Sequence, residues 1–238
     1  MSLNKELKSF DDAVSSVFDG ATIMISGFGG SGGTTQNLIK SLRDHGAKNL
    51  TIISNTGGLA SVIGFGSIKN QKIIDIGILV ENSQVKKLIA SYPVSPSSSK
   101  KISFEEAYLE GKAELELVHQ GNMIVRIRAG GAGIPAVYTP TGVVTSLSQG
   151  KEVRVFDNRE YILEHAIKAD FAFIKAYKSD KIGNVIYKGT SQSFGRVMST
   201  AANKTYIEVD FIVETGMIDP NIIHTPTIYV DGVILVKK

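Results

Sequence analysis

Apolar and polar positions in the first part of the chain predict strands that are separated by a helix. Residues 21–25 and 50–54 are mostly apolar and β-branched, which is typical of short buried strands. Between them, Leu38, Ile39 and Leu42 fall on one helical face, with charged positions opposite, and Gly46 is expected to end this helix. Strand, helix and strand in this order are typical of a parallel βαβ unit.

The remaining elements follow less regular patterns. Ser9 and Asp12 have the spacing of a capping box at the start of a helix. Residues 72–80 form an apolar run that fits either a strand or a helix. Further strands are expected at 85–92, 113–118, 169–178, 204–210 and 227–236, and further helices at 104–109, 121–129 and 161–167 (Tyr161 to Ile167). The pattern predicts an α/β fold with a mostly parallel sheet and flanking helices, in a single domain over residues 1–238.

The composition narrows the classes of protein. Of the 238 residues, 42% are hydrophobic and 21% are charged, as in ordinary soluble proteins. A formal net charge of +3 without a basic run gives no indication of nucleic-acid binding. The first residues lack the apolar core of a signal peptide, and no apolar run reaches the roughly 20 residues of a membrane span. The sequence thus indicates a cytoplasmic protein with no membrane partner, and the absence of Cys excludes thiolate catalysis.

A glycine-rich segment, Gly27 to Gly33, follows the first predicted strand and precedes a helix. Glycines let the backbone approach a ligand, and the amides of a first helical turn favour a phosphate, a carboxylate or an oxyanion. The segment is not a Rossmann fingerprint, because Ser54 and Asn55 rather than an acid end the second strand, and it lacks the Gly-Lys-Ser/Thr of a P-loop. The glycine-rich segment can therefore be interpreted either as an anion-binding site or as a flexible turn.

Two more segments carry amide side chains or glycines. Asn55 lies at the carboxyl end of the second strand, the edge at which open α/β sheets bind ligands. Gln120 precedes a short helix that ends in Gly130, Gly131 and Gly133, a second group of approachable backbone amides. Neutral donors suit the stabilisation of an oxyanion in acyl transfer, where one donor contributes on the order of 3 kcal/mol. An ordinary asparagine turn at Asn55 is the alternative.

A search for a nucleophile finds no clear candidate. The sequence has no Gly-x-Ser-x-Gly elbow, and its four His, at 45, 119, 165 and 224, lack the spacing of metal ligands. Glu81 fits a surface cap better than a catalytic carboxylate. Arg126 and Arg128 fit a carboxylate substrate, although structural ion pairs are favoured. No metal site is expected, and oxyanion donors without a nucleophile correspond to half of an active site.

Several blocks of the chain resemble the A-type (alpha) subunit of the 3-oxoacid CoA-transferases, the family I enzymes related to succinyl-CoA:3-ketoacid CoA-transferase. The N-terminal signature of that family, an Asp-Gly pair, an apolar run and a glycine loop with Phe, is similar to Asp19 through Thr34. Further matches are VKKLIASY, HQGNMIVRIRAGGAGIPAVYTPTG, IKAYKSDKIGN and VETGMIDPNIIHTPTIYV. They follow the family order from about residue 10 to 236, which is nearly the whole chain.

The resemblance implies an α/β domain that pairs with a B subunit of similar fold, in an A2B2 assembly, around a shared active site. It also implies ping-pong catalysis. The acyl-CoA is attacked by a Glu of the B subunit to give an acyl-glutamyl anhydride, then a glutamyl-CoA thioester, and CoA passes to an acceptor carboxylate. Coenzyme A is then a substrate, and no permanently bound cofactor is expected. The acceptor, a 3-oxoacid or another short-chain carboxylate, is not identified by the sequence.

The resemblance also implies roles for individual residues. Asn55 and Gln120 match amides that position the substrate and stabilise the oxyanion. Substrate or CoA binding is implied for the two glycine segments, that is for Gly27, Phe28, Gly29, Gly130, Gly131 and Gly133. Three signature positions differ, because Ser26 replaces a Gly, Thr34 replaces a Pro and Thr56 replaces a second Asn.

Another class of function stays open beside the enzyme. A ligand-sensing domain of similar fold could bind a phosphorylated metabolite or an acyl-CoA at the glycine loop without any chemistry. A glutamate-bearing B partner distinguishes the two hypotheses, since only the enzyme needs one. A nucleotide-dependent oxidoreductase is disfavoured because the second strand lacks the acid that binds a ribose.

Overall fold

The computed structural model describes residues 4–29, 32–60, 62 and 73–237. Its main sheet has eight strands and the order β11-β10-β8-β1-β2-β3-β4, with β9 paired to β8. The bounds are β1 (Thr22–Ile25), β2 (Leu50–Ile53), β3 (Val85–Ala90), β4 (Glu114–Leu117), β8 (Ala169–Asp180), β9 (Val185–Ile186), β10 (Ala202–Val213) and β11 (Gly232–Leu235). Strand β9 runs antiparallel to β8, and the other neighbouring pairs are parallel. The predicted mostly parallel sheet is confirmed.

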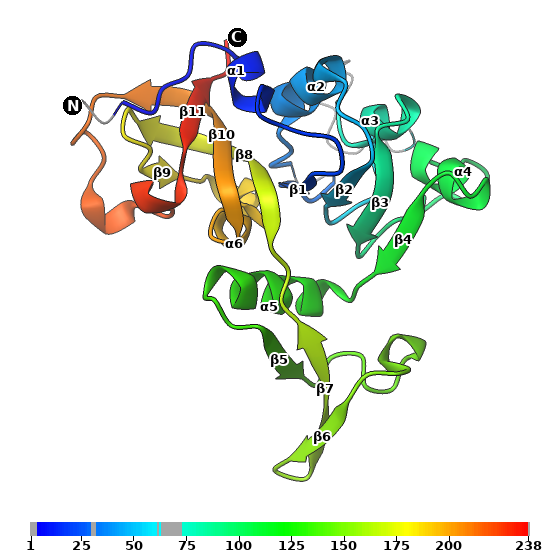
Figure 1. Ribbon diagram of the computed structural model, residues 1–238. Helices are drawn as coiled ribbons and strands as arrows, with labels where there is room; N and C mark the ends of the chain where they lie inside the picture. Colours follow the sequence, from blue (N-terminus) through cyan, green and yellow to red (C-terminus); the bar gives the residue numbers. More distant parts are fainter. Residues whose placement is uncertain (1–3, 30–31, 61, 63–72, 238) are drawn as a thin grey trace.

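Helices cover both faces of this sheet (Figure 1). They are α1 (Phe10–Val14), α2 (Gln36–His45), α3 (Gly77–Glu81), α4 (Ser103–Leu109), α5 (Gln120–Gly131) and α6 (Gly195–Met198). Alternate residues of β1 face opposite sides, so Ile23 and Ile25 pack with α1 to α4 while Met24 packs with α5 and α6. The protein thus has three layers, with a buried apolar cluster on each face of the sheet.

The local signals in the sequence have their expected structural basis. Ser9 and Asp12 form a reciprocal capping box at the start of α1. Gly46 ends α2 in the left-handed conformation, with φ of 83°. The apolar run at 72–80 proves to contribute a helix, α3, rather than a strand, although its first residue, Lys72, lies outside the described residues. The expected strands at 85–92 and 113–118 and the helix at 104–109 are confirmed.

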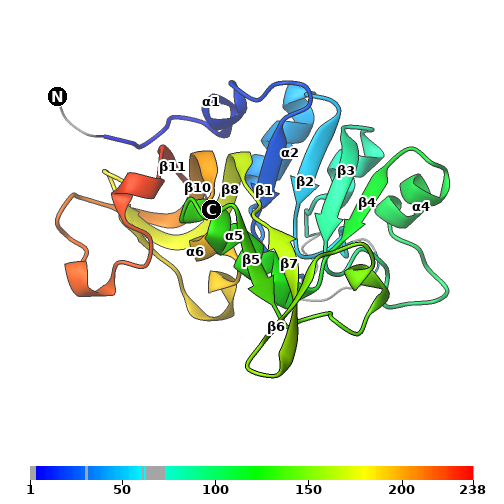
Figure 2. The same ribbon diagram turned by 60° about the horizontal axis from the view of Figure 1, so that its bottom comes forward.

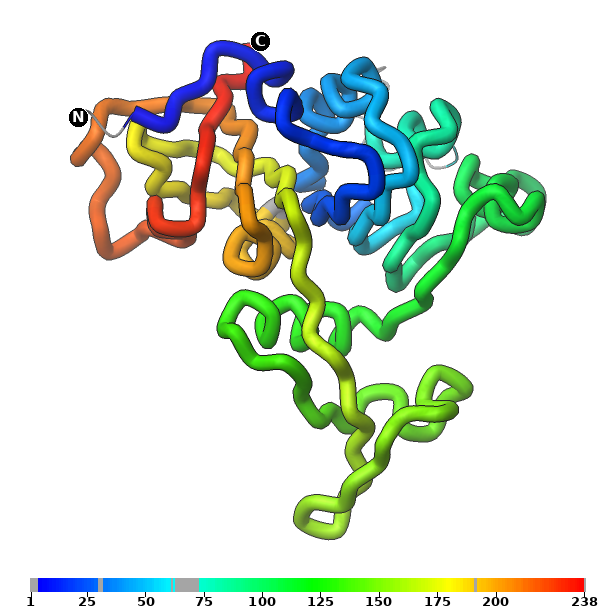
Figure 3. Tube along the Cα trace, in the orientation of Figure 1, coloured from blue at the N-terminus to red at the C-terminus, as the bar shows by residue number. Residues whose placement is uncertain are grey.

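The two ends of the chain lie together along one edge of the sheet. Figure 3 shows the N-terminal segment running beside the last strand, β11. The amide of Leu7 donates to the carbonyl of Val233, and the amide of Val233 donates to the carbonyl of Lys5. These hydrogen bonds partly cover the β11 edge, which would otherwise expose unpaired backbone groups.

A second, three-stranded sheet projects from the main body next to α5 (Figures 1 and 2). It consists of β5 (Ala136–Thr139), β6 (Val153–Phe156) and β7 (Arg159–His165), antiparallel in the order β5-β7-β6. The predicted helix from Tyr161 to Ile167 is therefore wrong. Asp157 and Asn158, with φ of 47° and 59°, form a two-residue hairpin turn that continues β6 into β7.

A buried polar cluster joins this small sheet to the main body. Asn122 of α5 donates to Glu164 of β7 at 2.9 Å and accepts from the Thr139 hydroxyl at 3.1 Å. Lys151 also pairs with Glu164, at 2.6 Å. Glu164 is only 4% exposed, so its carboxylate oxygens need these hydrogen-bond partners, and the cluster fixes the small sheet against α5.

Candidate functional site

The two predicted amide residues, Asn55 and Gln120, meet at the carboxyl edge of the main sheet. Asn55 follows β2, and Gln120 is the first residue of α5, just after β4. Nε2 of Gln120 donates to Oδ1 of Asn55 at 2.8 Å. In the sheet β3 lies between β2 and β4, so this hydrogen bond bridges the end of β3. Asn55 is 2% exposed, and its backbone carbonyl accepts from the amides of Ser91 and Tyr92.

This pair leaves one side-chain donor without a partner among the described residues. With Oδ1 bound to Gln120, Asn55 keeps its Nδ2 group as a donor, and this group makes no hydrogen bond within the described ranges. Helix α5 begins beside the pair, and its N-cap residue, His119, makes no side-chain cap bond. The first-turn amides of α5 and its positive dipole end therefore lie next to Asn55. Such an arrangement favours a negatively charged oxygen.

The glycine loop begins with a tight turn that excludes a side chain. Gly27 has φ of 135°, and a Cβ there would lie 2.6 Å from Oγ1 of Thr34, so a larger residue does not fit. The hydroxyl of Ser26 donates to the carbonyl of Gly33 and accepts from the amide of Lys175, which ties the loop to β8. These two hydrogen bonds explain why Ser is accommodated at a position where the family pattern has Gly. Gly30 and Ser31 lie outside the described residues.

Phe28 and Gly29 complete the described part of this loop. The Phe28 ring is 39% exposed and stacks on Phe194, with 6.3 Å between the ring centroids. Gly29 has φ of 55° and lies near Leu59 and Thr56. The loop therefore sits between β8 and the turn after β2, beside Asn55, and the structure brings these two predicted segments together.

The first turn of α2, by contrast, already holds a carboxylate of the protein itself. The amides of Asn37 and Leu38 donate to Oε2 of Glu208, a residue of β10, at 3.0 and 3.1 Å. Glu208 is 2% exposed, and burial raises its pKa above the ordinary value. The N-cap residue, Thr35, makes no side-chain cap bond, so Glu208 takes over that function. The anion at these two amides is therefore a carboxylate of the protein itself, and binding of a ligand anion elsewhere along the glycine loop stays a prediction.

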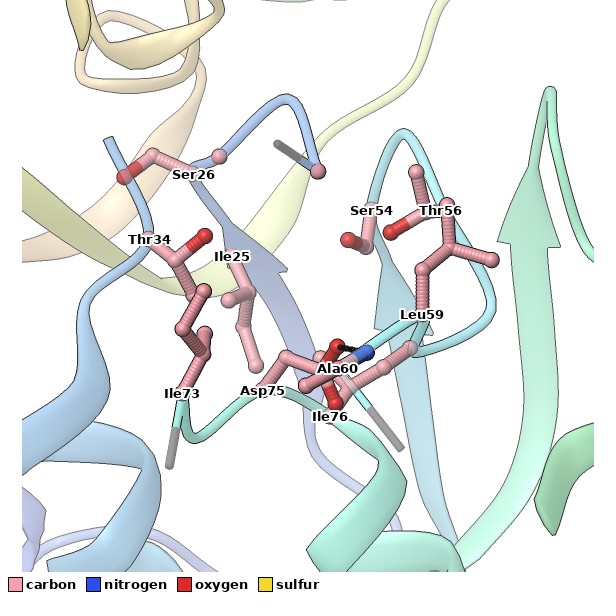
Figure 4. Close-up of a pocket in the computed structure, with 12 residues that line it drawn as sticks. Ile25, Ser26, Thr34, Ser54, Thr56, Leu59, Ala60, Ile73, Asp75 and Ile76 are labelled. Carbon is pink, nitrogen blue, oxygen red and sulfur yellow. Dashed lines mark hydrogen bonds between the residues drawn. The ribbon is translucent and has the colours of Figure 1, made fainter. Parts of the chain in front are cut away.

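A small cavity beside the glycine loop gathers the three positions that depart from the family signature. Its volume is about 20 Å³, and hydroxyl-bearing residues Ser26, Thr34, Ser54 and Thr56 line it (Figure 4). Because Ser26, Thr34 and Thr56 share this one cavity, the three substitutions change the same surroundings together. The cavity lies at the carboxyl ends of β1 and β2, next to Asn55.

Asp75 also lines this cavity, and the sequence analysis did not identify it as a site residue. Its carboxylate accepts from the amides of Ala60 at 2.8 Å and Gly77 at 3.0 Å. Burial raises the pKa of Asp75, and these amide hydrogen bonds oppose that rise. The sequence signal that could have identified Asp75 is a single acid inside the apolar run 72–80. An acid in such a run needs hydrogen-bond partners if it is buried.

The second predicted glycine group lies elsewhere. Gly130 and Gly131 belong to the last turn of α5, and a Cβ on them would lie 2.1 Å from the Ile167 carbonyl and 2.3 Å from the Thr200 hydroxyl. Both glycines thus permit close packing of α5. At 1.5 Å per residue, Gly130 is about 15 Å along the axis from Gln120. The structure does not bring Gly130, Gly131 and Gly133 to the amide pair, and their role in CoA binding stays a prediction.

Other charged residues that the sequence singled out have structural roles. Arg126 pairs with Glu116 at 2.9 Å and donates to the His165 carbonyl, so the favoured structural ion pair is confirmed for this residue. Glu81 accepts from the hydroxyl of Ser103, consistent with a surface role. In the part of the chain that the structure describes, no three His, Cys, Asp or Glu side chains are grouped as metal ligands. None of the helices in the described ranges has the length and apolar character of a membrane span.

Comparison with known proteins places this chain in a family. The coenzyme A transferase family pattern matches residues 7–235. The A-type subunit of the probable succinyl-CoA:3-ketoacid coenzyme A transferase of Bacillus subtilis (strain 168) is 44% identical over 233 residues, 98% of this chain and 90% of that protein. The A-type subunit of the 3-oxoadipate CoA-transferase of Acinetobacter baylyi is 42% identical over 236 residues, 99% of this chain and 96% of that protein.

A solved structure shares the fold. An acyl-CoA transferase of Escherichia coli O157:H7 superposes with a TM-score of 0.81 at 23% identity, and the match covers 98% of this chain and 48% of that longer chain. The chain therefore belongs to the coenzyme A transferase family. Within that family it is a CoA-transferase subunit of the A type, as the sequence predicted.

Proposed function

We propose that this chain forms the A half of a heteromeric enzyme that moves CoA between succinyl-CoA and a 3-oxoacid or another short-chain carboxylate. The hydrogen-bonded pair of Asn55 and Gln120 carries the proposal, because it offers a side-chain donor for an oxyanion at the carboxyl edge of the main sheet. The acids named for the two similar proteins, a 3-ketoacid and 3-oxoadipate, are the candidate acceptors.

A B subunit supplies the nucleophilic Glu in this proposal, in an A2B2 assembly. Its carboxylate attacks the thioester carbonyl, the C–S bond breaks, and an acyl-glutamyl anhydride and CoA thiolate result. The thiolate then attacks the glutamyl carbonyl, which releases the donor acid as a carboxylate and leaves a glutamyl-CoA thioester. Attack of the acceptor carboxylate on that thioester, followed by return of the thiolate to the new acyl group, completes the transfer.

The present chain acts on the charge that develops in these steps. Each tetrahedral intermediate carries a negative oxygen, which Nδ2 of Asn55 and the first amides of α5 stabilise. Gln120 holds the Asn55 side chain in the orientation that presents Nδ2. Gly27, Phe28 and Gly29 form the neighbouring wall, against which the substrate packs. These donors are neutral and fixed by the sheet, so the site needs little reorganisation when the charge appears.

The proposal extends to the setting of the enzyme. Coenzyme A enters as a substrate, and the described residues require no permanently bound cofactor for this chemistry. The buried cluster around Glu164 supports the view that the whole chain, 1–238, acts as a single domain. A cytoplasmic location fits the use of acyl-CoA thioesters, which are intracellular metabolites.

The ligand-sensing alternative loses the observation that motivated it. A phosphorylated metabolite at the glycine loop was expected to bind the first amides of α2, and the Glu208 carboxylate occupies two of them. A phosphate brought to the same amides would meet a buried acid rather than free donors. In this proposal the first amides of α5, beside Asn55, bind the oxyanion of the transfer reaction.

Co-expression of this chain with a glutamate-bearing B subunit of the same family tests the proposed function. The purified complex is expected to transfer CoA from succinyl-CoA to acetoacetate, 3-oxoadipate or a short-chain acid, and the isolated chain is expected to transfer none. The measurement is thioester formation for each acid, with the two separately purified subunits as controls. Full activity of the isolated chain, or a stable complex that transfers CoA to no acid, contradicts the proposal.

A further inference from the structure

Ser91 lies at the end of the strand that the amide pair bridges, and the proposed catalytic steps do not use its side chain. It is the first residue after β3, the strand between β2 and β4 (Figure 1). The hydrogen bond from Gln120 to Asn55 crosses the end of that strand. The backbone amide of Ser91 donates to the carbonyl of Asn55 at 3.3 Å, so the two residues are neighbours across adjacent strands.

The strand pattern places the side chains of Ser91 and Asn55 on the same face of the sheet. Ile53 pairs with Ile89, and both belong to the apolar cluster that also contains residues of α5. Asn55 and Ser91 each follow these residues by two positions, and the pairing is still in register one residue further on. Side chains alternate between the two faces along a strand, so Asn55 and Ser91 both point to the side that α5 covers.

The Ser91 hydroxyl is buried and unpaired. Its Oγ atom is shielded from solvent, and it makes no hydrogen bond to any part of the chain that the structure describes. A buried hydroxyl without a partner costs free energy, so such a group in a folded protein needs an explanation. The amide of Ser91 binds the Asn55 carbonyl whatever the side chain is, so the strand pairing itself gives no reason for a hydroxyl at this position.

Asn55 has an acceptor site that a neighbouring hydroxyl can fill. Its Oδ1 atom carries two lone pairs, and Gln120 uses one of them. A donor at the second lone pair would fix the carboxamide at two points and keep Nδ2 directed at the substrate. Neighbouring strands lie about 4.8 Å apart, so rotation about the Cα–Cβ bond brings the Ser91 hydroxyl within reach of a side chain on the same face of β2.

We propose that Ser91 is a positioning residue whose hydroxyl donates to Oδ1 of Asn55 when the oxyanion forms, an inference that rests on the proposed function. Hydrogen bonds at catalytic sites are often long or poorly aligned without substrate, and they tighten in the transition state. When Nδ2 of Asn55 donates to a negative oxygen, the carboxamide is polarised and its Oδ1 becomes a stronger acceptor. The Ser91 hydroxyl then gains a partner, so its contribution arises in the transition state and is absent from the protein without substrate.

Replacement of Ser91 with alanine in the A–B complex tests this role. Ser91→Ala is expected to lower kcat by about tenfold, because it removes one hydrogen bond that forms only with the oxyanion. The KM for succinyl-CoA is expected to stay within about twofold, since the neutral thioester carbonyl does not draw on this contact. Ser91→Thr keeps the hydroxyl and is expected to retain a kcat within about threefold of the wild type. An unchanged kcat in Ser91→Ala contradicts the positioning role.

A double variant distinguishes action through Asn55 from an independent effect. When Ser91→Ala is combined with Asn55→Ala, kcat is expected to match that of Asn55→Ala alone, since the hydroxyl no longer has a carboxamide to orient. Steady-state kinetics of the wild type, the two single variants and the double variant give this comparison. Multiplicative losses of kcat would show that Ser91 acts without Asn55, and they would overturn the assignment.

Thermal stability separates this role from a purely structural one. Because the Ser91 hydroxyl is unpaired without substrate, Ser91→Ala is expected to leave the melting temperature unchanged or to raise it by up to about 4 °C. Ser179 is the matched control, a buried serine whose hydroxyl donates to the Asp180 carbonyl at 2.9 Å. Ser179→Ala is expected to lower the melting temperature by about 2–4 °C and to leave kcat unchanged. A lower melting temperature with an unchanged kcat in Ser91→Ala would show that the hydroxyl is only structural.

A binding measurement separates failure of this role from failure of the proposed function. Succinate is titrated into the complex and followed by NMR, because its carboxylate presents a negative oxygen to the same donors and requires no transfer activity. Its dissociation constant is expected to rise by about threefold in Ser91→Ala and to stay the same in Ser179→Ala. Equal affinity in the wild type and Ser91→Ala overturns the positioning role, whereas a Ser91-dependent affinity in a complex that transfers no CoA refutes only the proposed reaction.

Discussion

Replacement of Asn55 with alanine is expected to lower the kcat of the A–B complex by about 100-fold or more. The Asn55 Nδ2 group is the free side-chain donor of the amide pair, and loss of one oxyanion donor typically costs about 100- to 1,000-fold. Because this hydrogen bond strengthens only as the oxyanion forms, the KM for succinyl-CoA is expected to change little. Asn221→Ala, at an exposed turn, is the matched control and is expected to leave kcat unchanged.

Loss of Gln120, the hydrogen-bond partner of Asn55, is expected to lower kcat less than loss of Asn55. Its effect is expected to depend on the presence of Asn55. Gln120→Ala is expected to lower kcat by about tenfold, because Gln120 acts chiefly by orienting Asn55. The double variant is then expected to be no slower than Asn55→Ala alone, since the orienting contact has no remaining target. Steady-state kinetics of all four forms give this comparison. Strictly multiplicative losses, or an unchanged kcat in either single variant, would remove the pair from the oxyanion site.

Loss of the Glu208 side chain is expected to have the largest effect on stability. Glu208→Ala removes a carboxylate that accepts from Asn37 and Leu38, and it leaves two first-turn amides of α2 without partners. Unsatisfied buried donors and lost charged hydrogen bonds together cost about 3 kcal/mol or more. For a chain of this size the melting temperature is expected to fall by about 6–12 °C. Glu160→Ala, at an exposed position of β7, is expected to change stability by less than about 0.5 kcal/mol.

Glu208→Gln tests the charge of this residue separately from its shape. Burial raises the pKa of Glu208 above its ordinary value of 4.5, so the folded protein binds this proton more tightly than the unfolded chain does. Stability from this group is therefore lost as the pH rises from about 4.5 through the raised pKa. The glutamine cannot lose a proton and still accepts from the α2 amides. The variant is expected to gain stability relative to the wild type across that window, and a constant difference in unfolding free energy would contradict the raised pKa.

The sequence predicted the parts of the fold that depend on local patterns. Short apolar runs at 21–25 and 50–54, separated by a helical pattern, define a βαβ unit, and parallel strands place their carboxyl ends at one edge. That rule predicted Asn55 at this edge, and the structure shows that Gln120 lies there too and is hydrogen bonded to it. The small antiparallel sheet was missed because the turn at Asp157 and Asn158 was not recognised as a hairpin signal.

Long-range partners explain most of what the sequence could not predict. Glu208 caps α2 from 170 residues away along the chain. The sequence around the glycine loop does not predict that this carboxylate occupies amides in the first turn of α2. The sequence also could not show that Gly130 and Gly131 pack closely against Ile167 and Thr200, while their role in CoA binding stays a prediction. Asp75 lies in an apolar run of the sequence. The backbone amides that donate to its carboxylate can be identified only from the fold.

The central claim, that this chain stabilises the oxyanion while its partner provides the nucleophile, has one direct test. The A–B complex is incubated with succinyl-CoA without an acceptor, and the intact mass of each subunit is then measured. The proposed mechanism predicts that the B subunit gains the mass of CoA less one water, bound as a glutamyl thioester and released by hydroxylamine, while the 238-residue chain keeps its mass. A CoA adduct on this chain, with the B subunit unmodified, would contradict that mechanism.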